Sequence, residues 1–205
     1  MQIRAVLGSL TEGDDDVLVN ASNTALRLGS GVSAAIGRAC GPGYQAALDE
    51  HRTRCGELEQ GDVVITGAGH HPRAKAVAHV AVMDYRGGVS ARSFPSLATI
   101  EAAVARLWPK VEATDLPSVR VAMVALGAGT GGLGPRDSVR VAAESLRAYR
   151  ELVPTTKIAA VTFYAVSILE HVAMAAALAD VFPEVLDGLS PEALDLVDAM
   201  RRGRA

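Results

Sequence analysis

The sequence is poor in aromatic residues and has no strong excess of charge. Aromatic side chains make up 4% of the 205 residues, while hydrophobic residues make up 49%. The core is therefore expected to be built mainly from small aliphatic side chains. The formal net charge is −3, which gives no reason to expect bulk affinity for nucleic acid or for an acidic membrane. We predict neither a nucleic acid nor a membrane partner.

Cysteine, long apolar runs and metal-ligand spacings are scarce as well. Cys40 and Cys55 are too few for a disulfide framework, so we expect two reduced thiols. No apolar run approaches the roughly 20 residues that cross a bilayer. The first residues, MQIRAVLGS, lead directly into an expected strand and lack the layout of a signal peptide. These absences predict a cytoplasmic protein.

Histidine and aspartate clusters invite a metal site, but their spacing argues against one. Adjacent residues on a strand face opposite ways, so His70 and His71 do not converge, and no cysteine or carboxylate completes a set with His79. The run Asp14–Asp16 is expected to be a solvated turn. We predict neither a metal nor a cofactor.

Hydrophobic periodicity alternates between the two kinds of secondary structure. Strands are expected at residues 2–8, 17–20, 62–66, 76–82, 119–126 and 158–166, and helices at 32–40, 43–54, 96–108, 135–152 and 167–180. Helices between strands favour a layered α/β sandwich with a largely parallel sheet.

The pattern changes after residue 183, which divides the chain into residues 1–183 and 184–205. Ser190 and Pro191 begin a short helix with apolar residues on one face. We interpret residues 184–205 as a docked helical extension; a dimer contact and a frayed tail remain alternatives.

A short apolar strand leads into two asparagines and a glycine turn. The run 17–19 is typical of a buried parallel strand, and Asn20 and Asn23 follow at its carboxyl end, where open α/β sheets place ligands. Residues 29–31 then open a helix. The free N–H groups of a helix start favour an anion, most often phosphate. The alternative is that both asparagines have a structural role only and satisfy the backbone of their own turn.

A second glycine-rich segment occupies residues 127–132 and contains G-x-G-x-x-G after a strand. That spacing alone resembles a dinucleotide-binding fingerprint. Its position two-thirds along the chain argues against this, as does the helix signal that starts only at Pro135.

These segments resemble the macro domain, the ADP-ribose-binding module. VNASN and LGSGVSAAI are similar to its asparagine motif and glycine-rich loop. Residues 61–80 are similar to its paired central strands, and residues 123–135 to its second phosphate loop. The resemblance covers residues 1 to about 180. It implies a three-layer α/β/α sandwich with a mixed, largely parallel central sheet, in which the exposed loop 84–95 borders the site.

The resemblance also implies roles for individual residues. Asn23 holds the distal ribose beside the scissile bond, and Asn20 supports the loop. The two glycine segments clamp the pyrophosphate, and the adenine lies near the ends of the first and last strands. The implied binding residues are Ser9, Leu10, Asn20, Asn23, Gly29, Ser30, Gly31, Val32, Ser33, Gly127, Ala128, Gly129, Thr130, Gly131, Gly132, Tyr164 and Val166.

Four positions depart from the family pattern. Ser9 stands where many members carry an adenine-binding aspartate. Ser33 and Gly37 stand where hydrolytic members carry an aspartate and a histidine. The second loop lacks its usual aromatic residue. Val166 takes the place of an adenine-stacking aromatic, with Tyr164 two residues earlier on the same face.

The retained features concern diphosphate and ribose, and the lost ones concern adenine and the catalytic aspartate. The resemblance therefore implies a protein that binds ADP-ribose or ADP-ribosylated protein. Hydrolysis of ADP-ribosyl esters or O-acyl-ADP-ribose remains open, with Asn23 as the candidate catalytic residue. The alternative is a module that binds another nucleotide-sugar or phosphate-rich ligand without catalysis.

Overall fold

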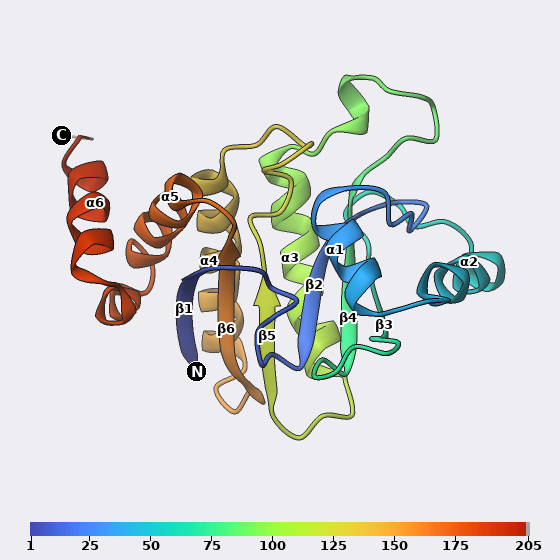
Figure 1. Cartoon of the computed structure of the whole chain (residues 1–205), viewed down its shortest axis with the longest axis horizontal. Coiled ribbons are helices and arrows are strands. Elements are labelled where there is room, and N and C mark those ends of the chain that lie inside the picture. Colours follow the sequence, from blue (N-terminus) through green and yellow to red (C-terminus); the bar gives the residue numbers. More distant parts are fainter. Residues whose placement is uncertain (204–205) are drawn as a thin grey trace.

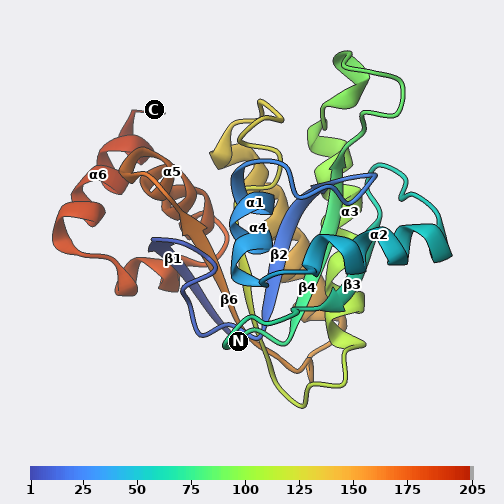
Figure 2. The same ribbon diagram turned by 45° about the vertical axis from the view of Figure 1, so that its right-hand side comes forward.

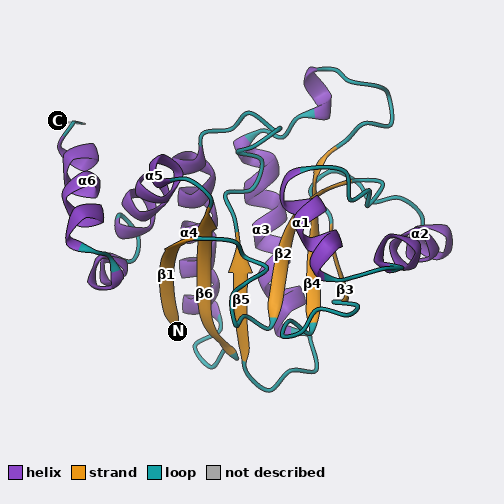
Figure 3. Cartoon of the chain, in the orientation of Figure 1, coloured by secondary structure: helices purple, strands orange, loops and turns teal. Residues whose placement is uncertain are grey.

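The computed structural model, which describes residues 1–203, has one six-stranded sheet with helices on both faces (Figures 1 and 3). The strands are β1 (Gln2–Leu7), β2 (Val17–Asn23), β3 (Val63–Gly67), β4 (Ala76–Met83), β5 (Val119–Met123) and β6 (Ile158–Ala165). Their order is β1-β6-β5-β2-β4-β3, and only β3 runs antiparallel to its neighbour. The carboxyl ends of the five parallel strands therefore share one edge. The predicted mixed, largely parallel sheet is confirmed.

The helices form a layer on each side of this sheet. They are α1 (Gly31–Ala39), α2 (Tyr44–Cys55), α3 (Leu97–Glu112), α4 (Pro135–Leu152), α5 (Ile168–Ala179) and α6 (Pro191–Arg202), with short 3₁₀ turns η1 (Ala91–Ser93) and η2 (Pro183–Gly188). Helices α1 and α2 lie on one face, and α3, α4 and α5 lie on the other (Figures 1 and 2). Helix α6 packs outside α5, where Val197 is fully buried.

Alternating strand residues fill two separate cores. Val17 and Val19 pack with α3, α4 and α5, whereas Leu18 packs with Ile36 and Leu48 of α1 and α2. Since both faces are covered, the central strands are mostly apolar, as expected for parallel sheets, and their buried polar residues include Asn20 and His79. Among the described residues, no helix combines the length and apolar character that a membrane span needs.

Several predicted boundaries move. β2 extends to Asn23 rather than ending at residue 20, so this asparagine lies within the strand, next to a register shift. β5 ends at Met123 instead of residue 126. Helix α3 continues through Pro109 because Trp108 and Val111 beyond the expected end are fully buried, and their packing offsets the lost backbone hydrogen bond.

Two further expectations were wrong. Residues 61–80 do form a strand pair, but β3 is an edge strand rather than a central one. Asp15 is buried at 3% exposure instead of lying in a solvated turn, and its carboxylate accepts hydrogen bonds from Tyr164 and Thr162. Cys40 and Cys55 are free thiols, as predicted.

Candidate functional site

A cavity of about 580 Å³ opens at the carboxyl edge of the sheet. Its volume lies in the range of small-molecule sites, and its place at the strand ends is the usual one for open α/β sheets. Both glycine segments border it. The predicted residues that line it are Ser9, Leu10, Asn23, Gly29, Ser30, Gly31, Val32, Ser33, Gly127, Gly129, Thr130, Gly131, Tyr164 and Val166.

Three predicted binding residues do not line the cavity. Asn20 is fully buried and bonds within the protein, so it supports the wall without forming it. The N–H groups of Ala128 and Gly132 donate to the carbonyls of Ala125 and Gly129, which places both residues in the internal turns of the second loop.

The first glycine segment leaves the start of α1 open to the cavity. Ser30 is the N-cap, but its side chain makes no capping hydrogen bond. The N–H groups of the first helical turn have no intrahelical acceptor. A side chain built at Gly29 or Gly31 would meet no atom within 4 Å, so open space lies beside this turn. The helix dipole adds partial positive charge at the same place.

The second glycine segment is a tight loop with a similar set of free donors. Gly127 has a φ of +73°, and a Cβ on Gly131 would lie 2.4 Å from the carbonyl oxygen of Gly127. Glycine is therefore required where the loop crosses itself. Within the described residues, the N–H groups of Gly129, Thr130 and Gly131 have no protein acceptor. The Thr130 hydroxyl is also unpaired there, so it does not cap the turn.

Asn23 closes the turn that follows β2. Its Nδ2 donates to the carbonyl oxygen of Arg27 at 2.9 Å, and its Oδ1 accepts from the Arg27 N–H at 3.0 Å. The turn is strained, since Leu26 has a φ of +55° and is held there by its buried side chain. The alternative interpretation of Asn23, as a residue that satisfies the backbone of its own turn, is thus correct in part. A primary amide has two N–H groups and two lone pairs, so one of each remains available in the cavity.

A buried polar network fixes α1 to the sheet. The Ser33 hydroxyl donates to Asn20 Oδ1 at 2.8 Å, and Asn20 Nδ2 bonds His79 Nδ1 at 3.1 Å. On its other side, His79 Nε2 lies 3.1 Å from the hydroxyls of Tyr44 and Thr66. Burial lowers the pKa of His79 to about 4, with a smaller contribution from His51. Ser33 is thereby engaged as a structural donor and is no base.

The opposite end of the cavity is lined by residues of β6 and the loop after β1. The Tyr164 hydroxyl donates to Asp15 Oδ2 at 2.8 Å, and burial is the main cause that raises the pKa of Tyr164. Ser9 pairs its hydroxyl with Thr11 at 2.8 Å. Val166 is 82% exposed and presents only methyl groups. Apart from the Glu170 carboxylate, which accepts from the Val166 N–H at 3.2 Å, this end offers a ligand mainly apolar surface.

Several wall residues were missed by sequence reasoning: Gly8, Ala21, Ser22, Arg27, Ala35, Val82, Met83, Tyr85, Val124, Ala125 and Glu170. Most adjoin predicted residues along the chain and follow from the strand ends meeting at one edge. Arg27 is different, because the turn at Asn23 brings it back to the cavity, where it also bonds Asp49 at 3.0 Å. Tyr85 belongs to the loop, residues 84–95, that was expected to border the site.

The histidines form no metal centre. Among residues 1–203, no three histidine, cysteine or acidic side chains gather as metal ligands would. His71 instead fixes a surface turn, since its Nδ1 accepts from the Ala74 N–H at 2.9 Å and its Nε2 lies 3.1 Å from the Thr11 carbonyl.

Comparison with known sequences agrees with this geometry. The family model of the macro domain matches residues 19–142. A protein of Cronobacter turicensis named O-acetyl-ADP-ribose deacetylase is 46% identical over 87 residues, which cover 42% of this chain and 49% of that protein. An uncharacterized protein of Mycobacterium tuberculosis is 36% identical over 141 residues, covering 69% of this chain and 36% of that one. The chain spans about half the length of the named deacetylase.

Solved structures share the fold at low sequence identity. The Oceanobacillus iheyensis macrodomain with ADP has a TM-score of 0.72 at 21% identity, covering 89% of this chain and 91% of that one. The Trypanosoma brucei macrodomain in complex with ADP-ribose has a TM-score of 0.69 at 20% identity, covering 84% and 67%. Fold and family model agree: the chain belongs to the macro domain family.

Proposed function

We propose that this protein binds ADP-ribose, free or attached to a protein, in the cavity at the carboxyl edge of the sheet. The observation that carries the proposal is the pair of unpaired N–H sets that border one cavity, from the start of α1 and from residues 129–131. Oriented N–H groups at helix starts and in glycine loops bind phosphate. Two such sets on one cavity suit a diphosphate.

The two ends of the cavity suit the two ends of the ligand. Asn23 offers one N–H and one acceptor to vicinal hydroxyls of the distal ribose. Tyr164 and Val166 offer an apolar surface to the base. Arg27, which is paired with Asp49, lines the wall near the sugar end. The relatives support this choice, since solved macrodomains include complexes with ADP and with ADP-ribose.

Calorimetry with ADP-ribose tests the proposal directly. We expect saturable binding to the wild-type chain and a rise in melting temperature, because a ligand that binds only the native state stabilises it. Gly129→Val adds a side chain in open space on the cavity wall and is expected to abolish binding without lowering the melting temperature. Gly67→Val, in equally open space outside the cavity, is the matched control. Absence of binding to the wild type at millimolar ADP-ribose would reject the proposal.

A second candidate is hydrolysis of an ADP-ribosyl ester, favoured by the relatives named O-acetyl-ADP-ribose deacetylase. Among the described residues the only carboxylate that lines the cavity is Glu170, which lies at the base end. A reaction here would rely on orientation of the bound ester and of a water molecule. Water would add to the acyl carbonyl and release the carboxylic acid and ADP-ribose.

Incubation with O-acetyl-ADP-ribose separates this candidate from binding alone. An enzyme releases acetate faster than the spontaneous rate, and Asn23→Ala slows the release. A wild-type chain that binds ADP-ribose without accelerating acetate release is a binding module. Parallel titration with a GDP-linked sugar examines the broader alternative, since equal affinity would assign the cavity to nucleotide-sugars in general.

A further inference from the structure

Tyr85 is an aromatic side chain at the sugar end of the cavity that the proposed binding scheme does not use. It lies two residues beyond Met83, and the Met83 carbonyl accepts from the Thr24 N–H at 2.9 Å, next to Asn23. Strands β5 and β2 separate this position from Tyr164 on β6. Tyr85 and Asn23 thus share one end of the cavity.

The Tyr85 side chain is unpartnered. It is 39% exposed, and its hydroxyl makes no hydrogen bond to any described residue. An exposed ring on a mobile loop would contribute little to recognition, because ordering it costs entropy. Whether the Tyr85 backbone is ordered before a ligand binds depends on the contacts of the residues on either side of it.

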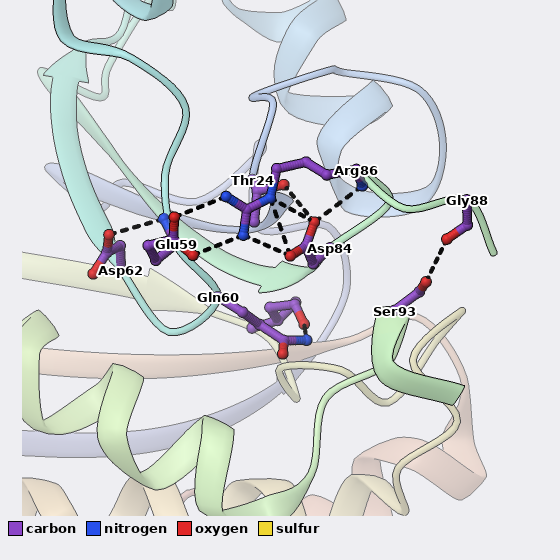
Figure 4. A network of polar contacts seen from close by, with 9 residues as sticks. Thr24, Glu59, Gln60, Asp62, Asp84, Arg86, Gly88 and Ser93 are labelled. Atoms are coloured by element: carbon purple, nitrogen blue, oxygen red, sulfur yellow. Dashed lines mark hydrogen bonds and ion pairs between the residues drawn. The ribbon is translucent and has the colours of Figure 1, made fainter. Parts of the chain in front are cut away.

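A network of ion pairs holds the residues on both sides of Tyr85 (Figure 4). The Arg86 guanidinium donates to both oxygens of Glu59, at 2.8 and 2.7 Å, and to both oxygens of Asp84, at distances down to 2.6 Å. Asp84 also accepts from the Thr24 hydroxyl at 3.3 Å. These contacts hold the pKa values of Asp84 and Glu59 below their usual range. We call Glu59, Asp84 and Arg86 the clamp.

The clamp differs from an ordinary surface ion pair. Single exposed pairs contribute little, but bidentate arginine contacts in a network restrict geometry. This network joins the segment before β3 to the end of β4, and Thr24 joins it to the end of β2.

The loop after Tyr85 is closed as well. The Asp84 N–H donates to the Ser93 carbonyl at 3.0 Å, and the Gly88 N–H donates to the Tyr85 carbonyl at 3.0 Å. The Ser93 hydroxyl donates to Gly88 at 2.8 Å. The backbone of Tyr85 is therefore fixed from both directions, and its side chain lines the cavity.

We propose that Tyr85 packs against the sugar held by Asn23 and sets the preference of the cavity for a diphosphate that carries a second ribose over a bare diphosphate. The clamp is a positioning device for this ring. The inference rests on the proposed function and adds a specificity-determining residue to it. Flat aromatic faces pack well on the C–H surface of a sugar, and the free hydroxyl is available to a sugar hydroxyl.

The test compares the affinities for ADP-ribose and for ADP, which lacks the second ribose. For Tyr85→Ala we expect ADP-ribose to bind about tenfold more weakly and ADP to bind as before. Tyr85→Phe keeps the ring and most of the preference. Val89→Ala, in the same loop but outside the cavity wall, is the matched control and leaves both affinities unchanged.

Arg86→Gln tests the clamp. It is expected to lower the ADP-ribose preference in the same direction by a smaller factor. If the clamp acts through the ring, Arg86→Gln costs nothing further in the Tyr85→Ala background. Additive losses would contradict the positioning role.

The possible failures are distinct. A wild-type chain that binds neither nucleotide overturns the proposed function and this inference with it. A chain that binds both, and whose Tyr85→Ala variant weakens ADP and ADP-ribose equally or weakens neither, overturns the inference alone.

Discussion

The two ends of the cavity use their polar groups in opposite ways. At the base end, the Tyr164 hydroxyl is engaged by Asp15 and the Ser9 hydroxyl by Thr11. At the sugar end, Asn23 retains a donor and an acceptor, and the Tyr85 hydroxyl has no partner among the described residues. The glycine loops between them keep several N–H groups free. The protein itself engages these hydroxyls at the end proposed for the base, and it leaves polar groups unpaired at the end proposed for the sugar.

This contrast indicates which part of the cavity selects between ligands. A site built to hydrogen-bond a group rejects analogues that lack it, because its own polar atoms are then left unpaired. An apolar surface discriminates weakly between ligands of similar shape. We therefore expect strong dependence on the diphosphate and the second ribose, and weak dependence on the base.

The largest effect is expected from a change in the glycine loop between the two ends, because binding at either end depends on how this loop holds the diphosphate. Gly131→Ala places a Cβ 2.4 Å from the Gly127 carbonyl oxygen, so the second loop must shift. We expect loss of ADP-ribose binding and a loss of unfolding free energy of about 1–3 kcal/mol. Gly129→Ala meets no neighbour and serves as the control in a thermal melt. Equal melting temperatures for the two variants would show that the loop is not packed as described.

A change confined to the sugar end has the next largest effect. Asn23→Ala removes two hydrogen bonds to the Arg27 backbone and leaves the strained turn at Leu26 unsupported. We expect about 1–2 kcal/mol of lost stability in urea unfolding and ADP-ribose binding weakened at least about tenfold. AMP, which reaches only the base end, should lose much less. A uniform loss for AMP and ADP-ribose would place Asn23 in the scaffold alone.

Acid is expected to destabilise the fold through His79, whose buried network fixes α1 to the sheet. Burial lowers the pKa of His79 to about 4 in the folded chain, against an ordinary value of 6.5. Between these values the unfolded chain binds the extra proton, so the unfolding free energy falls as pH drops through that window. The loss is about 2 kcal/mol between pH 7 and pH 5.

Urea unfolding at the two pH values measures this loss. His79→Gln should reduce the pH dependence, while His70→Gln, which alters an exposed histidine, should retain it. An unchanged pH dependence in His79→Gln would mean that other groups cause it.

The same contrast shows which features could be predicted from the sequence. The strand and helix pattern, and the two glycine segments, are local signals that periodicity and turn chemistry reveal. They were sufficient to predict a largely parallel sheet, whereas the residues expected at the cavity wall were implied by the resemblance to the macro domain. Asn20 was expected to support the loop but was also counted among the binding residues, because sequence position does not reveal that its amide is engaged by Ser33 and His79.

Features that join distant segments could not be predicted. The bond between Tyr164 and Asp15 links residues 149 positions apart, and the clamp joins Glu59 to Arg86 across 27 positions. Asp15 was predicted to lie in a solvated acidic turn, because the pattern of charges along the sequence does not reveal that Tyr164 covers it and donates to it. Arg27 reaches the cavity only because Leu26 adopts a positive φ, which its residue type disfavours.

The smallest expected effect comes from strengthening the contact with the base. Val166 lines the cavity and is 82% exposed, so a larger side chain there fits without disturbing the core. Val166→Phe supplies a ring to the base, and we expect about threefold to tenfold tighter binding of ADP-ribose, ADP and AMP alike. Ribose 5-phosphate, which has no base, should gain nothing. Leu169→Phe alters a residue that is 80% exposed but outside the wall, and should leave every affinity unchanged. If both variants behave alike in calorimetry, the base does not lie against Val166, and the two ends of the cavity must be assigned again.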